Sequence, residues 1–280
     1  MRKNSSAPSR DASEQDEEAR ERVSPPGEVV YQAIYREGDH ELKRSNGALA
    51  WSALAAGLSM GFSFVTEGLL HSHLPASDWR ETITKFGYSI GFLIVILGRQ
   101  QLFTKNTLTV MLPLLNRRGR GRPKHVARLW SIVLLANLVG AFLFAWLVAH
   151  SKAFPPSVHV AFAELGAEHF GGSFLDVSLR AMLAGWLIAL MIWLLPFAET
   201  ARVWVITLLA YVVGLGHLPH IVAGSIPVFY QLLTGAASAS NAMLDFLLPT
   251  VLGNAVGGVA LVAALAHAEL SPTARPDHAD

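Results

Sequence analysis

The chain has 280 residues, of which 52% are hydrophobic and only 15% are charged, and its net charge is +1. Soluble domains carry about a quarter charged residues, so this composition excludes an ordinary soluble surface. The balanced charge predicts no nucleic-acid partner. The sequence contains no cysteine, which excludes disulfides, thiolate metal sites and cysteine nucleophiles.

The first 46 residues contain no run long enough to cross a membrane. They open with RKNSSAPSRDASEQDEEARERVSPPG, a charged stretch with serine and proline that predicts a disordered tail over residues 1–27. No apolar segment follows the early basic residues, so we expect no signal peptide. Residues 28–46 predict a short amphipathic helix at the cytoplasmic rim, with an apolar side formed by Val29, Val30, Ala33 and Ile34.

Six apolar runs follow, each of the length that a bilayer-spanning helix needs, about 20 residues. They lie at residues 47–70, 83–115, 126–149, 177–197, 203–230 and 246–267. We therefore expect an all-α membrane protein with six transmembrane helices over residues 47–268 and a C-terminal tail over residues 269–280.

The loop NRRGRGRPKHVAR between the second and third runs sets the expected orientation. Lysine and arginine concentrate in short cytoplasmic loops, so this loop and, with an even number of spans, both termini are expected in the cytoplasm. Topology explains these basic residues better than a nucleic-acid patch does.

The second and fifth runs are interrupted by polar and helix-breaking residues. LGRQQLFTKNT divides the second run, and GLGHLPH, which contains Pro219, divides the fifth. Backbone can leave the helix at membrane depth only where protein or a water-filled cavity satisfies its polar groups. Breaks at matching positions of two three-span halves predict an inverted repeat around a solute pore, which the histidines of the fifth run would face.

Three motifs, in order along the chain, resemble those of the formate/nitrite transporter family over about residues 26–269. They are QLFTKNT in the second run, the interrupted fifth run with its histidine, and LPTVLGNAVGGVALV in the sixth. The resemblance implies an aquaporin-like protomer assembled as a homopentamer, with one pore per subunit and no cofactor. It also implies a multi-pass protein of a bacterial inner membrane.

The resemblance carries roles to individual residues. Leu102 and Thr104 match the family's loop leucine and threonine, and His220 matches its central histidine. The other matched positions are the second-span gates Tyr88 and Phe92, the fifth-span gate position Val213, and His169, where relatives place an outer-vestibule lysine.

Arg99 and Lys105 depart from the family pattern, because each replaces a glycine beside the LFT motif. Two interpretations stay open for them. They either bias the inner vestibule toward anions or neutralise carboxylates and loop carbonyls. Such departures indicate a divergent branch, for which neither formate nor nitrite can be assumed as substrate.

The expected mechanism follows from hydration. A small monovalent anion is costly to desolvate between apolar rings, whereas its conjugate acid is far less so. We therefore expect a channel or transporter for small monovalent anions or their weak acids, formate, nitrite or similar. His220 would assist protonation, because the reference pKa of histidine is about 6.5.

A membrane redox enzyme is the alternative, with His71, His73, His217 and His220 as ligands of haem or metal. His71 and His73, however, lie at a span end beside Pro75, which suits an outer loop better. No GxSG-type site indicates an intramembrane serine protease. The pore is therefore the preferred interpretation, and no enzyme activity or metal is expected.

Overall fold

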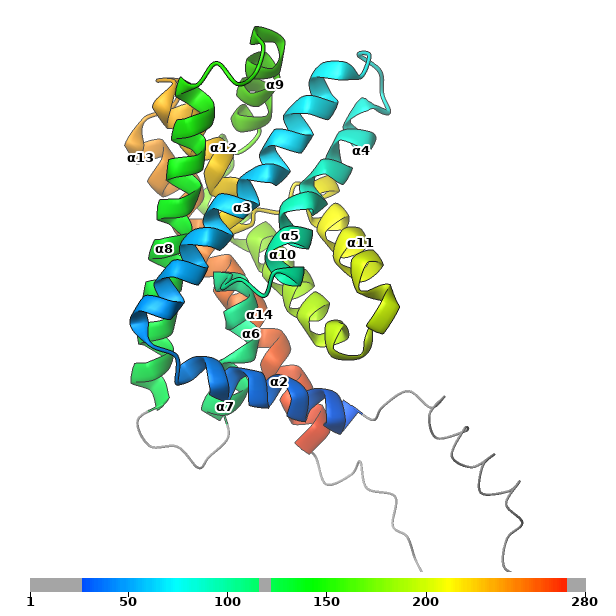
Figure 1. Cartoon of the computed structure of the whole chain (residues 1–280), viewed down its shortest axis with the longest axis vertical. Coiled ribbons are helices and arrows are strands. Elements are labelled where there is room, and N and C mark those ends of the chain that lie inside the picture. The colour runs from blue at the N-terminus through cyan, green and yellow to red at the C-terminus, as the bar shows by residue number, and fades with distance from the viewer. Residues whose placement is uncertain (1–26, 116–121, 271–280) are drawn as a thin grey trace, which may run out of the picture.

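The computed structural model describes residues 27–115 and 122–270, which are helical with no β-strand among them. Three predicted features lie outside the described residues: the tail before Gly27, the basic loop residues 117–120 and the end of the chain after Leu270. Figure 1 shows the helices running between two ends of the molecule, one carrying α9 and the other α2. We call these the α9 side and the α2 side.

Four helical segments among the described residues are long and apolar enough to cross a membrane. They overlap the four helices α3 (Asn46–His73), α8 (Arg122–His150), α10 (Phe174–Leu194) and α14 (Leu248–Leu270). These helices correspond to predicted runs one, three, four and six. Small residues let these helices pack in pairs. A Cβ at Gly57 of α3 would overlap the Asn137 carbonyl oxygen of α8, and one at Gly257 of α14 would overlap the Met182 carbonyl oxygen of α10.

The second and fifth predicted runs are each divided into shorter pieces. The second consists of α4 (Arg80–Thr84), the 3₁₀ turn η1 (Lys85–Gly87), α5 (Tyr88–Leu97), α6 (Phe103–Thr109) and α7 (Met111–Leu115). The fifth consists of α11 (Arg202–Leu215) and α12 (Ile221–Leu233). The backbone leaves the helix at residues 98–102 and 216–220, within the two interrupting motifs. Each piece is too short to qualify as a span by length alone.

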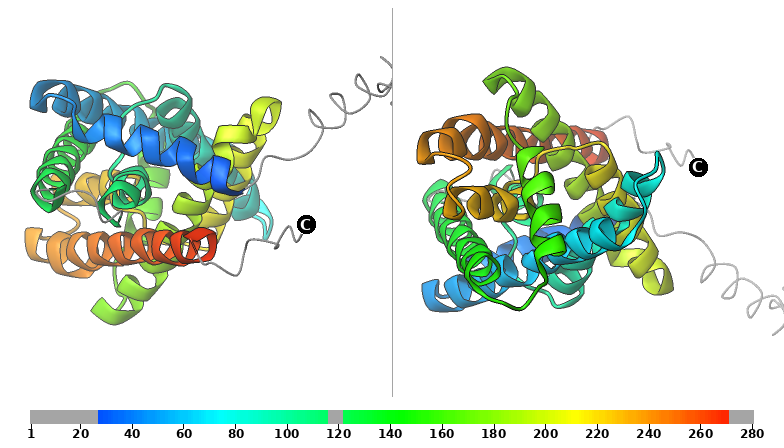
Figure 2. Two further views of the ribbon diagram at one scale, coloured as in Figure 1. Left: turned by 90° about the horizontal axis from the view of Figure 1, so that it is seen from below. Right: turned by 90° about the horizontal axis from the view of Figure 1, so that it is seen from above.

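The remaining elements close the two ends. Helix α2 (Gly27–Leu42) lies across the α2 side, where Figure 2 shows it in blue, and buries Tyr31, Ile34 and Leu42. Helix α9 (Pro156–Ala167), which the sequence analysis did not predict, lies at the opposite end. The other short elements are η2 (Leu195–Phe197), η3 (Glu199–Ala201), α13 (Ala239–Asn241) and the π-helical turn η4 (Ala242–Leu247).

The two breaks adopt the same backbone conformation. Each begins at a glycine, with φ −73° and ψ 0° at Gly98 and φ −78° and ψ 0° at Gly216. A left-handed residue follows, Arg99 with φ 51° or His217 with φ 46°. Three residues later an extended residue caps the next helix, Leu102 for α6 and His220 for α12.

One buried asparagine holds each break. Asn137 of α8 accepts a hydrogen bond from the Phe103 N–H (2.9 Å) and donates to the carbonyl oxygens of Ala53 (2.7 Å) and Gln101 (2.9 Å). Asn254 of α14 accepts from the Ile221 N–H (2.8 Å) and donates to the carbonyl oxygens of Ala181 (2.7 Å) and Pro219 (2.9 Å). The polar backbone that a broken helix exposes is therefore satisfied in the same way in both halves.

Candidate functional site

The two breaks meet at a contact between Thr104 and His220. The Thr104 Oγ1 lies 2.7 Å from the His220 Nε2, although the two residues are 116 positions apart in the sequence. Thr104 is in the first turn of α6 and His220 caps α12, and both side chains are buried. Two residues that the sequence analysis placed in the pore are thus brought together at the centre of the molecule.

The other ring nitrogen of His220 is occupied by the backbone. Its Nδ1 accepts a hydrogen bond from the Ala223 N–H (3.2 Å), which caps the N-terminus of α12. A nitrogen that accepts an N–H carries no proton, so the neutral ring holds its proton on Nε2 and donates it toward Thr104. A second proton on His220 would remove the helix cap.

Apolar side chains surround this contact. The Phe92 ring stands edge-on to the His220 ring with centroids 5.0 Å apart, and the Tyr88 ring packs against Phe92 at 5.4 Å. Phe92, Leu102 and Val213 are fully buried. An ion beside these side chains would lose its hydration without an equivalent replacement.

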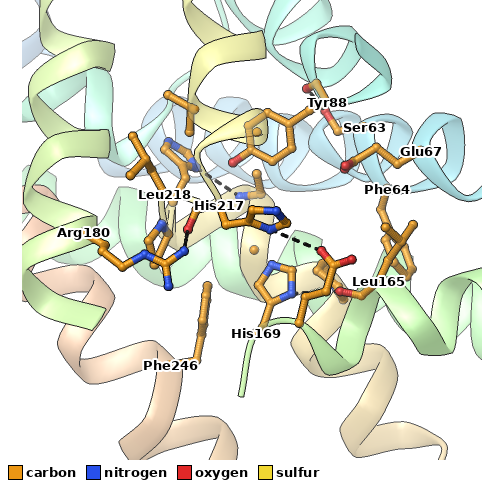
Figure 3. A pocket seen from close by; sticks show the side chains of 18 of the residues that line it. Ser63, Phe64, Glu67, Tyr88, Leu165, His169, Arg180, His217, Leu218 and Phe246 are labelled. Atoms are coloured by element: carbon orange, nitrogen blue, oxygen red, sulfur yellow. Dashed lines mark hydrogen bonds and ion pairs between the residues drawn. The ribbon is translucent and has the colours of Figure 1, made fainter. Parts of the chain in front are cut away.

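A pocket of about 90 Å³ extends from His220 toward the α9 side. Four predicted site residues line it, namely Tyr88, His169, Val213 and His220. Figure 3 shows the rings of Tyr88, His169 and His217 lying around its centre. His169 stands edge-on to Phe246, and its Nδ1 lies 3.0 Å from the Leu165 carbonyl oxygen.

Charged residues that the sequence analysis did not assign to the pore also line this pocket. The Lys85 Nζ lies 3.3 Å from the Glu67 Oε1 and 3.1 Å from the Glu168 Oε2. Burial alone would raise the pKa of the Glu168 carboxyl, but a hydrogen bond to His217 and the Lys85 ammonium lower it to about 2. Lys85 therefore places an ammonium group in this pocket. The sequence analysis had matched His169, not Lys85, to the vestibule lysine of relatives. No motif marks Lys85, because it stands at the edge of an apolar run.

A second cavity, of about 530 Å³, opens on the α2 side. It is lined by Arg99 and Lys105, together with Arg202 and residues of α2. The Lys105 Nζ pairs with the Glu37 Oε1 of α2 at 2.6 Å, whereas Arg99 is exposed. These two predicted residues thus line a different cavity from the one that reaches His220.

An all-helical fold with two broken segments that meet at a buried polar contact is typical of membrane transport proteins. Two solved structures share this fold at 18% identity: an "FNT family ion channel" (TM-score 0.75, covering 87% of this chain and 99% of that one) and a "Pentameric formate channel with formate bound" (TM-score 0.64, covering 88% and 99%).

Sequence comparison then identifies the family. The family profile described as "Formate/nitrite transporter" matches residues 28–268, and the chain belongs to that family. It is 36% identical over 242 residues to "Inner membrane protein YfdC" of Escherichia coli (strain K12), covering 86% of this chain and 78% of that protein. It is 27% identical over 242 residues to a "Formate-nitrite transporter" of Plasmodium vivax, covering 78% and 75%. The family is one of membrane transporters and channels, which supports the expectation of a non-enzyme.

Proposed function

We propose that this protein is a channel for small monovalent anions and their conjugate weak acids, with one pore through each subunit of a homopentamer. The two divided segments count as spans two and five, so that six spans form an aquaporin-like inverted repeat. The observation that carries the proposal is the 2.7 Å contact between Thr104 and His220, where two broken helices meet at the end of a pocket.

The chemistry of the contact favours a solute that passes as a neutral acid. Phe92, Leu102 and Val213 offer no hydrogen bonds to an anion, and the desolvation of a charge far exceeds that of the corresponding acid. Thr104 and His220 provide the polar atoms along this stretch. A passing solute breaks the hydrogen bond between these two side chains and forms hydrogen bonds to both of them through its own oxygens. Tyr88 and Phe92 form the gate on the α9 side of His220.

Both termini are placed in the cytoplasm in this proposal, so the α2 side is the inner mouth. Arg99 stands exposed in the inner cavity beside Arg202, so that both can meet an anion there. Lys105 serves a structural purpose, because its ammonium is paired with Glu37 at 2.6 Å. The outer mouth is then the α9 side, where His169 helps to form the wall of the vestibule.

A histidine-ligated redox enzyme is the alternative, and the contacts of its histidines favour the channel. Both ring nitrogens of His220 are engaged, one with Thr104 and one with the Ala223 N–H. His71 pairs instead with Glu164 (2.8 Å) at the outer end of α3.

The proposal is tested by solute flux into liposomes containing the purified protein. Formate, nitrite, acetate, lactate and hydrosulfide are compared at two pH values, with empty liposomes as the control. We expect saturable flux of at least one solute that rises as the pH falls. His220→Asn keeps a hydrogen-bonding end but carries no charge, and we expect it to alter the selectivity or rate of that flux. Absence of flux for all five solutes would contradict the proposed function.

A further inference from the structure

The equivalent left-handed positions of the two breaks both carry a side chain that can be cationic. Arg99 is the second residue of one break and His217 the second residue of the other, and each lines the cavity on its own side. Glycine adopts a left-handed backbone without steric penalty, whereas other residues are strained there. An arginine and a histidine in such strained positions point to a function for their side chains.

His217 differs from Arg99 in being surrounded by carboxylates. Its Nε2 lies 2.5 Å from the Glu81 Oε1, and its Nδ1 lies 3.4 Å from the Glu168 Oε2. Only the imidazolium form donates from both nitrogens, so this geometry favours a doubly protonated ring. The side chain is 37% exposed, which leaves it in reach of water and solute.

The neighbouring charges support the same state. Three carboxylates face His217 or its neighbours: Glu67 from α3, Glu81 from α4 and Glu168 after α9. Two permanent cations accompany them, Lys85 from η1 and Arg180 from α10. The Arg180 Nη2 donates a hydrogen bond to the His217 carbonyl oxygen at 2.6 Å. Two of these carboxylates, Glu81 and Glu168, contact the His217 ring directly, one at each nitrogen, so a protonated ring is paired on both sides. The other titratable side chains that line this pocket are Tyr88, His169 and His220.

We propose that His217 is the group that donates a proton to the permeating weak-acid anion, in the vestibule before the solute reaches His220. The inference rests on the proposed function. In this step the N–H bond of the imidazolium breaks and an O–H bond forms on a carboxylate or nitrite oxygen. The neutral acid moves on toward His220, and the neutral ring takes a new proton from outside water through the exposed Glu81.

His220, which the sequence analysis expected to assist protonation, is less suited to this step. Its Nδ1 caps α12 through the Ala223 N–H, so it cannot become an imidazolium without loss of that bond. It donates a hydrogen bond to the acid as it passes, and the proton itself comes from the vestibule.

The test is formate flux into proteoliposomes from about pH 5 to pH 8. Formate is almost wholly ionised over this range, and the neutral acid falls about tenfold per pH unit. With His217 as donor, wild-type flux falls much less steeply than the neutral acid does. His217→Asn, whose side chain tolerates a left-handed backbone, should follow the tenfold slope, so that it is close to wild type at about pH 5 and about tenfold or more below it at about pH 7.

Two variants separate proton donation from positive charge and from position. His217→Arg keeps a cation that gives up no proton, so it should lose flux near neutral pH as His217→Asn does. His71→Asn, which removes another outer histidine paired with a carboxylate, should match wild type. Glu81→Gln changes an exposed side chain and leaves the His217 ring in place. It should reduce flux near neutral pH less than His217→Asn does.

Each outcome decides the point. A wild-type slope in His217→Asn, or full flux near neutral pH in His217→Arg, would overturn the inference, as would a pH effect confined to His220→Asn. Size-exclusion profiles are compared first, and Glu81→Gln replaces any variant that does not assemble. A wild-type protein that conducts no weak acid would refute the proposed function instead.

Discussion

Removal of the Asn254 side chain should destabilise the protein by an amount that can be worked from its contacts. Asn254→Ala deletes three buried hydrogen bonds, to Ile221, Ala181 and Pro219. Side-chain hydrogen bonds within membranes contribute about 0.6 kcal/mol on average and at most about 1.7, so three give roughly 2–5 kcal/mol. The better helix propensity of alanine offsets about 0.6 kcal/mol of this. Asn137→Ala should lose a similar amount, since it also makes three such bonds.

Unfolding of the protein in mixed micelles with increasing dodecyl sulfate, followed by the fluorescence of its seven tryptophans, measures this loss. Thr250→Val is the matched control. Thr250 lies one turn before Asn254 on α14 and is buried, and its hydroxyl has no hydrogen-bond partner among the described residues. We expect that control to stay within about 0.5 kcal/mol of wild type. If Asn254→Ala is as stable as Thr250→Val, the asparagines do not hold the breaks and the reasoning is refuted.

Three further predictions concern assembly, the inner mouth and the gate. Native mass spectrometry of the detergent-solubilised protein should show pentamers, and monomers or dimers alone would count against the proposed assembly. Arg99→Gly removes a strained left-handed arginine and should raise the free energy of unfolding by about 1 kcal/mol. Anion flux in this variant should fall more at low salt than at physiological salt, where the Debye length is about 8 Å. A loss of flux that does not depend on salt would argue for a structural role of Arg99. Phe92→Ala removes the ring packed on His220 and should admit larger acids such as lactate in the flux panel; an unchanged lactate-to-formate ratio would show that Phe92 is no gate.

The sequence predicted the positions of the two breaks because glycine, proline and polar residues interrupt otherwise apolar runs. The family resemblance assigned Thr104 and His220 to one site, whereas spacing alone does not relate residues more than a hundred positions apart. Asn137 was missed, because one asparagine in a long apolar helix gives no sign that it faces a broken backbone. Helix α9 was also missed, because its 12 residues are too few to register as a span.

The charged cluster of the α9-side pocket could not be predicted for a similar reason. Lys85 and Glu168 come from separate elements at the ends of helices, where charged residues usually meet solvent. Only the packing of these elements around one cavity brings their charges together. Arg99 and Lys105 were expected to act alike because each replaces a glycine beside the LFT motif. Lys105 instead pairs with a carboxylate of α2, whereas Arg99 stands exposed in the cavity that both line.

The shared scaffold of the two breaks has a consequence for how such pores diversify. In each break the asparagine of a neighbouring helix holds the backbone, and Leu102 caps α6 without any side-chain hydrogen bond. The backbone of a break therefore does not depend on a capping side chain, since Leu102 supplies none to α6, whereas the equivalent His220 adds one to α12. In the proposed pore, substitution at this position can change the chemistry of one half while the asparagine keeps the backbone in place. Proteins with this scaffold can therefore change the solute that they conduct while keeping the same arrangement of helices.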